Sequence, residues 1–254
     1  MDMLIDGIEI YYEFPRGFPA DAGQTLTLFL HGAGGSSQHW GPSLPHLSAC
    51  VRPLLVDLPG LGRSGGTVPD TVGDAARFLE RFLDQLGVAP PIACVGHSLG
   101  GLVVQQFALS SPSWVSRLIL VATAPRIRPH PDFLSAALTG RWDLDHLRAS
   151  FGSGTPREVQ DLVLNELPKT RLSEGATGFM DELDLREQVS ALSAVPTLIV
   201  TGDDDVIISP RHSRQLHQKI AGSTLLVVPG GGHYLQVEQP ERIAGAISQF
   251  LCGT

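Results

Sequence analysis

Short apolar runs alternate along the chain with longer segments in which apolar residues recur at helical spacing. Each short run has the length of a strand and carries almost no polar positions, which is typical of strands buried on both faces. The expected strands are residues 25–30, 52–56, 92–95, 118–122, 197–201 and 225–228. The expected helices are residues 71–86, about 99–110, 210–220 and 240–251. This order predicts an α/β fold, a mostly parallel central sheet with helices on both faces.

The N-terminus follows a different pattern. Residues 3–5 and 8–12 alternate apolar and polar side chains, and Asp6-Gly7 stands between them. Two alternating runs joined by such a turn predict an antiparallel hairpin.

Residues 125–191 contain no strand pattern. Their apolar side chains instead indicate short helices, and Thr155-Pro156 followed by Glu158 predicts an N-cap with proline at the first helical position. The segment is too small to form a core of its own. We therefore expect one domain, 1–254, with a small helical cap insertion at about 125–191.

Composition narrows the class of protein. Of the 254 residues, 43% are hydrophobic and 17% charged, a balance that argues against disorder. The net charge of −8 makes nucleic acid and membrane surfaces poor partners and favours a small-molecule substrate. The first residues, Met1 to Gly7, lack the features of a secretion signal, so a cytoplasmic location is expected. Oligomeric state is left open.

The three cysteines, Cys50, Cys94 and Cys252, are too few and too scattered to predict a disulfide framework. Cys94 stands in an apolar run and is expected to be buried. No cluster of His, Cys and carboxylate residues has metal-ligand spacing, and the Gly32, Gly34 and Gly35 glycines do not fit a dinucleotide-binding loop. No metal or cofactor is predicted.

Two segments match the G-x-S-x-G pattern of a nucleophilic serine. Gly96-His97-Ser98-Leu99-Gly100 is entered by an expected strand and left by an expected helix, whereas 62–66 follows a Pro-Gly loop and runs into Pro69. The pattern forms a nucleophile elbow only between a strand and a helix, so Ser98 is the candidate. The helix start also leaves the Leu99 N–H without a helical acceptor, and this donor can stabilise an oxyanion.

Five segments in this order resemble the landmarks of the α/β-hydrolase family, over nearly the whole chain. They are His31-Gly32-Ala33-Gly34-Gly35, the loop from Asp57 to Ser64, the Ser98 elbow, Gly202-Asp203-Asp204-Asp205, and Gly232-His233 with Glu238-Gln239-Pro240. The resemblance implies the α/β-hydrolase fold. It also implies a catalytic triad of Ser98, Asp205 and His233, in which the histidine is the base and the aspartate orients it. Asp204 is the alternative acid.

The same resemblance suggests the backbone N–H groups of Ala33 and Leu99 as the oxyanion hole. His97 is interpreted as a structural residue whose side chain points away from Ser98, and His31 as a hydrogen-bonded organiser of its loop. His39 carries no motif and is assigned to a surface or cap position, and Trp40 to the core. Aromatic residues of the insertion are candidates for the substrate pocket. They are Phe133, Trp142, Phe151 and Phe179.

The resemblance implies a serine hydrolase that cleaves a carboxylic ester of a small molecule through an acyl-enzyme on Ser98. Small members with a short cap include esterases, enol-lactonases and cofactor-free haloperoxidases. A lactonase, a thioesterase or a C–C bond hydrolase would use the same triad. A catalytically silent ligand-binding member of the fold is the alternative from another class, and turnover discriminates between them.

Overall fold

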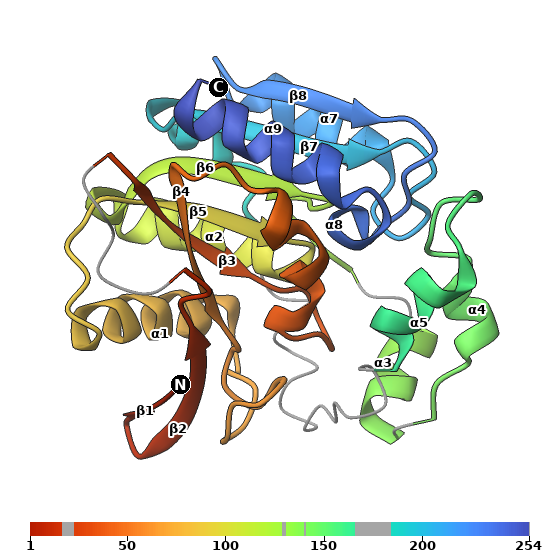
Figure 1. The fold of residues 1–254 in the computed structure, drawn as a ribbon, viewed down its shortest axis with the longest axis horizontal. Coiled ribbons are helices and arrows are strands. Elements are labelled where there is room, and N and C mark those ends of the chain that lie inside the picture. The colour runs from red at the N-terminus through yellow and green to blue at the C-terminus, as the bar shows by residue number, and fades with distance from the viewer. Residues whose placement is uncertain (17–22, 129–130, 140, 166–183, 254) are drawn as a thin grey trace.

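Eight strands form one sheet in the order β1-β2-β4-β3-β5-β6-β7-β8 (Figure 1). The computed structural model describes residues 1–16, 23–128, 131–139, 141–165 and 184–253. The strands are β1 (Asp2–Ile5), β2 (Ile8–Glu13), β3 (Thr25–Leu30), β4 (Val51–Val56), β5 (Ile92–His97), β6 (Val115–Val121), β7 (Thr197–Gly202) and β8 (Thr224–Val228). The α-helices are α1 (Val72–Gln85), α2 (Leu99–Ser110), α3 (Pro131–Thr139), α4 (Leu144–Arg148), α5 (Arg157–Leu164), α7 (Pro210–Lys219), α8 (Leu235–Glu238) and α9 (Pro240–Cys252). The 3₁₀ helices are η1 (Ser37–His46), η2 (Pro112–Trp114) and η5 (Val189–Ala194).

Every neighbouring pair from β4 to β8 is parallel, and the two N-terminal pairs are antiparallel. The β1–β2 hairpin turns at Asp6 and Gly7, with φ of 51° and 79°. Positive φ at both central residues is the geometry of the tight hairpin turn that Asp-Gly favours. The mostly parallel sheet and the N-terminal hairpin are both confirmed.

Alternate side chains of the strands enter two separate cores. In β3, Leu28 and Leu30 pack into the core that includes the buried faces of α1 and α2. Phe29, between them, packs into the core formed with α9 and with Trp40 of η1. Helices therefore cover both faces of the sheet, as predicted, and Trp40 is fully buried.

Parallel strands bring their carboxyl ends to one edge of the sheet, and ligands of open α/β sheets bind at that edge. His31 follows β3, Ser98 follows β5, Asp205 follows β7 by a short loop, and His233 lies after β8. Residues that are up to 202 positions apart in the sequence thus come to one place.

Between β6 and η5 the structure describes only helices, α3, α4 and α5, which Figure 1 shows beside the carboxyl-terminal edge of the sheet. Residues 166–183 of the predicted insertion lie outside the described residues. The N-cap prediction is wrong by one residue, because Pro156 occupies the N-cap of α5 and Thr155 precedes it. The Thr155 hydroxyl donates instead to the Glu238 carboxylate at 3.0 Å. None of the described helices is long and apolar enough to cross a membrane.

The cysteines depart from the prediction. Cys50 and Cys252 form a disulfide across 202 positions of sequence, and only Cys94 is a free, buried thiol. The pair forms because α9 packs against η1, which brings the C-terminal turn of α9 beside the loop that precedes β4. The spacing of the cysteines in the sequence does not predict this contact.

Candidate active site

Ser98 lies in a sharp turn between β5 and α2. Its backbone angles are φ 51° and ψ −118°, a strained conformation for a residue with a side chain. A Cβ at Gly96 would lie 2.5 Å from the Gly100 carbonyl oxygen, so glycine is required for this close approach of strand and helix. The Thr123 hydroxyl donates to the Ser98 carbonyl oxygen at 2.6 Å and holds the turn.

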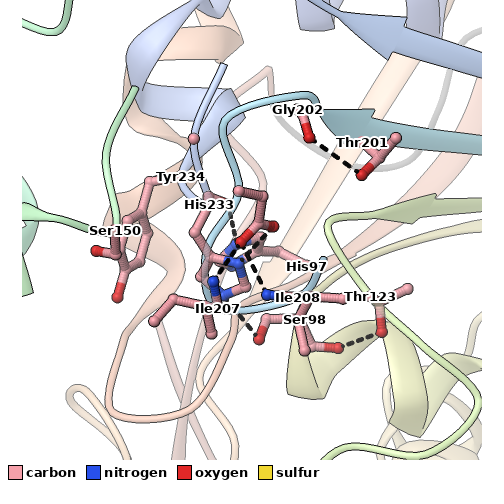
Figure 2. A network of polar contacts seen from close by, with 12 residues as sticks. His97, Ser98, Thr123, Ser150, Thr201, Gly202, Ile207, Ile208, His233 and Tyr234 are labelled. Carbon is pink, nitrogen blue, oxygen red and sulfur yellow. Dashed lines mark hydrogen bonds and ion pairs between the residues drawn. The ribbon is translucent and has the colours of Figure 1, made fainter. Parts of the chain in front are cut away.

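Three buried side chains from separate loops are joined by hydrogen bonds, and Figure 2 labels two of them, Ser98 and His233. The Ser98 Oγ lies 3.0 Å from His233 Nε2, and His233 Nδ1 lies 2.9 Å from Asp205 Oδ2. A carboxylate can only accept, so the Nδ1 atom carries the proton. The Nε2 atom then presents its lone pair to the Ser98 hydroxyl, a geometry in which an imidazole can accept a proton from a serine.

The loop that carries Asp205 also holds its carboxylate. The Oδ1 atom accepts hydrogen bonds from the backbone N–H groups of Ile207 and Ile208, each at 2.8 Å, which leaves Oδ2 for His233. Asp204 turns elsewhere, with its Oδ2 3.3 Å from the Ser153 hydroxyl. Of the two candidate acids, the structure therefore places Asp205 against the histidine.

His97 contacts the histidine rather than the serine side chain. Its Nε2–H donates to the backbone carbonyl of His233 at 2.8 Å, and the two rings lie 4.9 Å apart between centroids (Figure 2). Burial, aided by the nearby His233, holds the pKa of His97 well below its usual value, so its ring is neutral. His97 is among the residues that line the cavity at Ser98, and its side chain is held by the hydrogen bond to the histidine loop.

The loop after β3 is organised by His31. Its Nδ1–H donates to the Gly32 carbonyl at 2.8 Å, and its Nε2 accepts from the Leu58 N–H at 3.1 Å. Burial lowers the pKa of His31, which keeps the ring neutral. Ala33 of this loop and Leu99 both line the cavity at Ser98, and Leu99 is the first residue of α2, where the N–H has no helical acceptor.

The surface or cap assignment of His39 is wrong. His39 lies in η1, is only 3% exposed, and lines the cavity at Ser98. Neither ring nitrogen has a hydrogen-bond partner among the described residues. Burial, together with His31, lowers the pKa of His39 to about 3. The sequence around it has prolines at 42 and 45 and no helical period, so nothing in the pattern indicated that this side chain turns inward.

The cavity at Ser98 has a volume of about 450 Å³, within the range of small-molecule sites. Its wall is mostly apolar, and among its described residues Arg128 carries the one permanent charge. Tyr234 is neutral there, because burial and the Asp205 carboxylate raise the pKa of its phenol. The residues that line the cavity are Gly32, Ala33, His39, His97, Ser98, Leu99, Ile127, Arg128, Leu147, Ala149, Ser150, Val206, Ile207, Ile208, His233 and Tyr234.

The four aromatic residues proposed for the substrate pocket are not among these described lining residues. Trp142 packs between two of the hydrophobic cores, and Phe151 stacks on Tyr234 with ring centroids 4.9 Å apart. Phe151 lines a neighbouring cavity of about 740 Å³ instead. The side chain of Phe133 and all of Phe179 lie outside the described residues.

Comparison with known proteins agrees with this fold. The model of the alpha/beta hydrolase family matches residues 27–246. A pimeloyl-[acyl-carrier protein] methyl ester esterase of Edwardsiella ictaluri (strain 93-146) is 32% identical, over 91% of this chain and 95% of the relative. A putative carbamate hydrolase, RutD, of Caulobacter sp. (strain K31) is 28% identical over 98% of this chain and 97% of the relative.

The chain belongs to the α/β-hydrolase family, and it is a hydrolase. Among solved structures, the enol-lactonase from Burkholderia xenovorans LB400 superposes with a TM-score of 0.83, covering 99% of each chain at 21% identity. An esterase from Exiguobacterium antarcticum superposes with a TM-score of 0.82 at 23% identity, covering 97% of each chain. At such identities these two structures bear on the fold alone.

Several residues around the site were missed from sequence. Ser150 accepts a hydrogen bond at 2.7 Å from the backbone N–H of His233, and Glu238 binds the N–H groups on either side of that histidine. Glu238 was noted only as part of the histidine-loop resemblance. Its hydrogen bonds depend on which loops pack against each other in the folded protein, and a single sequence does not show which loops do so.

Proposed function

We propose that this protein is a serine hydrolase that cleaves a carboxylic ester of a small molecule through an acyl-enzyme on Ser98. The observation that carries the proposal is the continuous hydrogen-bond line from Ser98 through His233 to Asp205. A serine hydroxyl becomes a useful nucleophile only when a base of fixed orientation lies within hydrogen-bond distance.

The proposed reaction uses these three side chains in sequence. The Ser98 Oγ attacks the ester carbonyl carbon while its proton passes to His233 Nε2, and Asp205 stabilises the imidazolium that forms. The N–H groups of Ala33 and Leu99 bind the oxyanion. The intermediate collapses when His233 gives the proton to the alcohol oxygen, which leaves. Water then attacks the acyl-enzyme with His233 again as base, and the acid and free Ser98 are released.

The cavity wall favours an apolar substrate group. Val206 and Ile207 follow the catalytic acid directly, and 66% and 51% of their surfaces are exposed, although both line the cavity. With Leu147 from α4 they form an apolar surface that a bound acyl or alkyl group would cover, and each Å² of apolar surface so covered contributes about 25 cal/mol. The volume of about 450 Å³ favours short and medium chains over long ones.

The test is hydrolysis of p-nitrophenyl esters from acetate to palmitate by the wild-type protein and by Ser98→Ala. We expect turnover of the shorter esters and a loss of several orders of magnitude in the variant. A variant with wild-type activity would exclude Ser98 as the nucleophile. A wild-type protein that hydrolyses no ester, yet is labelled on Ser98 by a fluorophosphonate, would have an activated serine and a different substrate.

Two relatives named for a methyl ester and for a carbamate suggest the first alternatives to assay. Both groups place a carbonyl carbon next to a heteroatom leaving group, as the proposed reaction requires. Parallel measurements with a methyl ester, a simple lactone and a carbamate compare these bonds on the same enzyme preparation. Stoichiometric binding without turnover of any of them would instead favour a ligand-binding member of the fold.

A further inference from the structure

The backbone of the catalytic histidine is held by three consecutive N–H groups. The Gly232 N–H donates to Glu238 Oε2 at 2.9 Å, and the Tyr234 N–H donates to Glu238 Oε1 at 2.8 Å. Between them, the N–H of His233 itself donates to the Ser150 carbonyl at 2.7 Å. One carboxylate therefore binds the residues on both sides of His233.

The same carboxylate binds the segment that precedes α5. Glu238 Oε2 also accepts from the Gly152 N–H at 2.8 Å and from the Thr155 hydroxyl at 3.0 Å. Four donors from two distant segments thus converge on one half-buried side chain. A carboxylate has acceptor sites for four such bonds and no proton to place against a donor.

The two segments lie backbone against backbone. A Cβ on Gly152 would come within 2.0 Å of the Gly230 carbonyl oxygen, and a Cβ on Gly232 within 2.3 Å of the Gly152 nitrogen. Any displacement of residues 150–155 is therefore passed directly to the histidine loop. Ser150, the first residue of this segment, and Ala149, which precedes it, also line the cavity at Ser98.

We propose that Glu238 is a positioning residue that fixes His233 relative to Ser98 by joining the histidine loop to residues 150–155. The inference rests on the proposed serine-hydrolase function. Glu238 touches no reacting atom; it acts by keeping the His233 imidazole at hydrogen-bond distance from both Ser98 and Asp205.

The test is Glu238→Gln. A glutamine has one acceptor oxygen, so its NH₂ must face either the Tyr234 N–H or the three donors at the Oε2 position, and at least one donor beside His233 loses its acceptor. We expect kcat to fall about 10- to 100-fold, the effect of a small misplacement of a catalytic group. We expect KM to change by less than about threefold, because Glu238 does not line the cavity.

Activity is expressed per folded active site, counted by fluorophosphonate labelling of Ser98 and checked by thermal unfolding. Thr155→Val removes a single donor to Glu238 and is the second variant, with an expected fall in kcat of about two- to fivefold. Thr27→Val is its matched control. It also removes one hydrogen-bonded threonine hydroxyl, which donates to the Thr25 carbonyl at the other end of the sheet, and its kcat should stay at the wild-type value.

The outcomes separate the two proposals. If the wild-type protein hydrolyses ester but Glu238→Gln and Thr155→Val keep its kcat, the positioning role is refuted and the proposed function stands. If Glu238→Gln does not fold, the Thr155→Val kcat relative to Thr27→Val decides. A rise in KM at constant kcat would also refute positioning, because it would mean that Glu238 acts on substrate binding. A wild-type protein without hydrolysis or labelling refutes the proposed function, and this inference with it.

Discussion

Replacing Asp205 by asparagine should abolish most of the activity without removing a side chain from the site. The two backbone N–H groups at Oδ1, from Ile207 and Ile208, decide which way the new amide faces. Its NH₂ group cannot lie against two donors, so the amide oxygen takes that place and the NH₂ turns toward His233 Nδ1. His233 must then accept at Nδ1 and carry its proton on Nε2. That proton points at the Ser98 hydroxyl, and the base is lost.

The magnitude follows from this forced tautomer. In a serine protease the corresponding aspartate-to-asparagine change keeps the geometry and lowers kcat by about 10⁴-fold, which corresponds to about 5 kcal/mol of transition-state stabilisation. We expect a loss of that order here, with KM nearly unchanged, because the Asp205 side chain is almost fully buried behind His233.

The assay is p-nitrophenyl butyrate hydrolysis at pH 8, with Asp204→Asn as the matched control. Asp204 carries the same charge one residue earlier, but its carboxylate faces Ser153. We expect the control to keep its kcat within about threefold of wild type, since a solvated charge near the surface contributes little. The reasoning is refuted if Asp205→Asn retains more than about a tenth of the wild-type kcat, or if Asp204→Asn loses as much.

Three further changes test other parts of the structure. The pKa of His39 in the folded state, about 3, lies below the ordinary value, so its contribution to stability is complete above about pH 6.5 and is lost as the pH falls toward 3. In the wild type, His39 should make the unfolding free energy fall by about 1 kcal/mol for each pH unit between pH 6.5 and 4.5, and His39→Phe should remove that part of the pH dependence. Urea titrations across this pH range measure it; an equal pH dependence in the two proteins would contradict the prediction. Cys252→Ser should lower stability by about 2–4 kcal/mol with kcat unaffected, and equal urea midpoints before and after reduction of the wild type would contradict it. Ile207→Asn keeps the N–H that holds Asp205 and should raise KM for apolar esters by roughly tenfold; a fall in kcat alone would show that the side chain serves Asp205 instead.

The regular elements were predictable because burial on both faces produces an unambiguous pattern. The strand at 25–30 was predicted with the bounds that the structure shows, and the helix after Ser98 likewise. The η1 helix was not predicted, since Pro42 and Pro45 interrupt any helical period. His39 was misplaced for that reason, because its burial follows from the position of η1 and from nothing in its immediate neighbours.

Some residues of the candidate site were predictable from sequence and others were not. Ser98, Asp205 and His233 stand in motifs at the ends of strands, and parallel strands necessarily gather such ends at one edge. The Cys50–Cys252 bond and the contacts of Glu238 join segments that the sheet topology does not by itself place together. Contacts of that kind depend on how loops and terminal helices pack. The local sequence pattern therefore predicts residues at the ends of strands, but it does not predict these contacts between loops and terminal helices.

The loops that carry Asp205 and His233 lie main chain against main chain. At the end of β7, a Cβ on Gly202 would come within 2.0 Å of the Gly231 carbonyl oxygen, so the strand that leads to Asp205 lies directly on the histidine loop. On its other side that loop lies on Gly152 in the same manner. No side chain lies between the two backbones at these contacts, so no rotamer change can take up a shift of one loop relative to the other. A close-packed interface of this kind transmits a displacement. The loops that carry His233 and Asp205, whose side chains lie 2.9 Å apart, are therefore supported by main-chain contacts as well as by the Glu238 carboxylate.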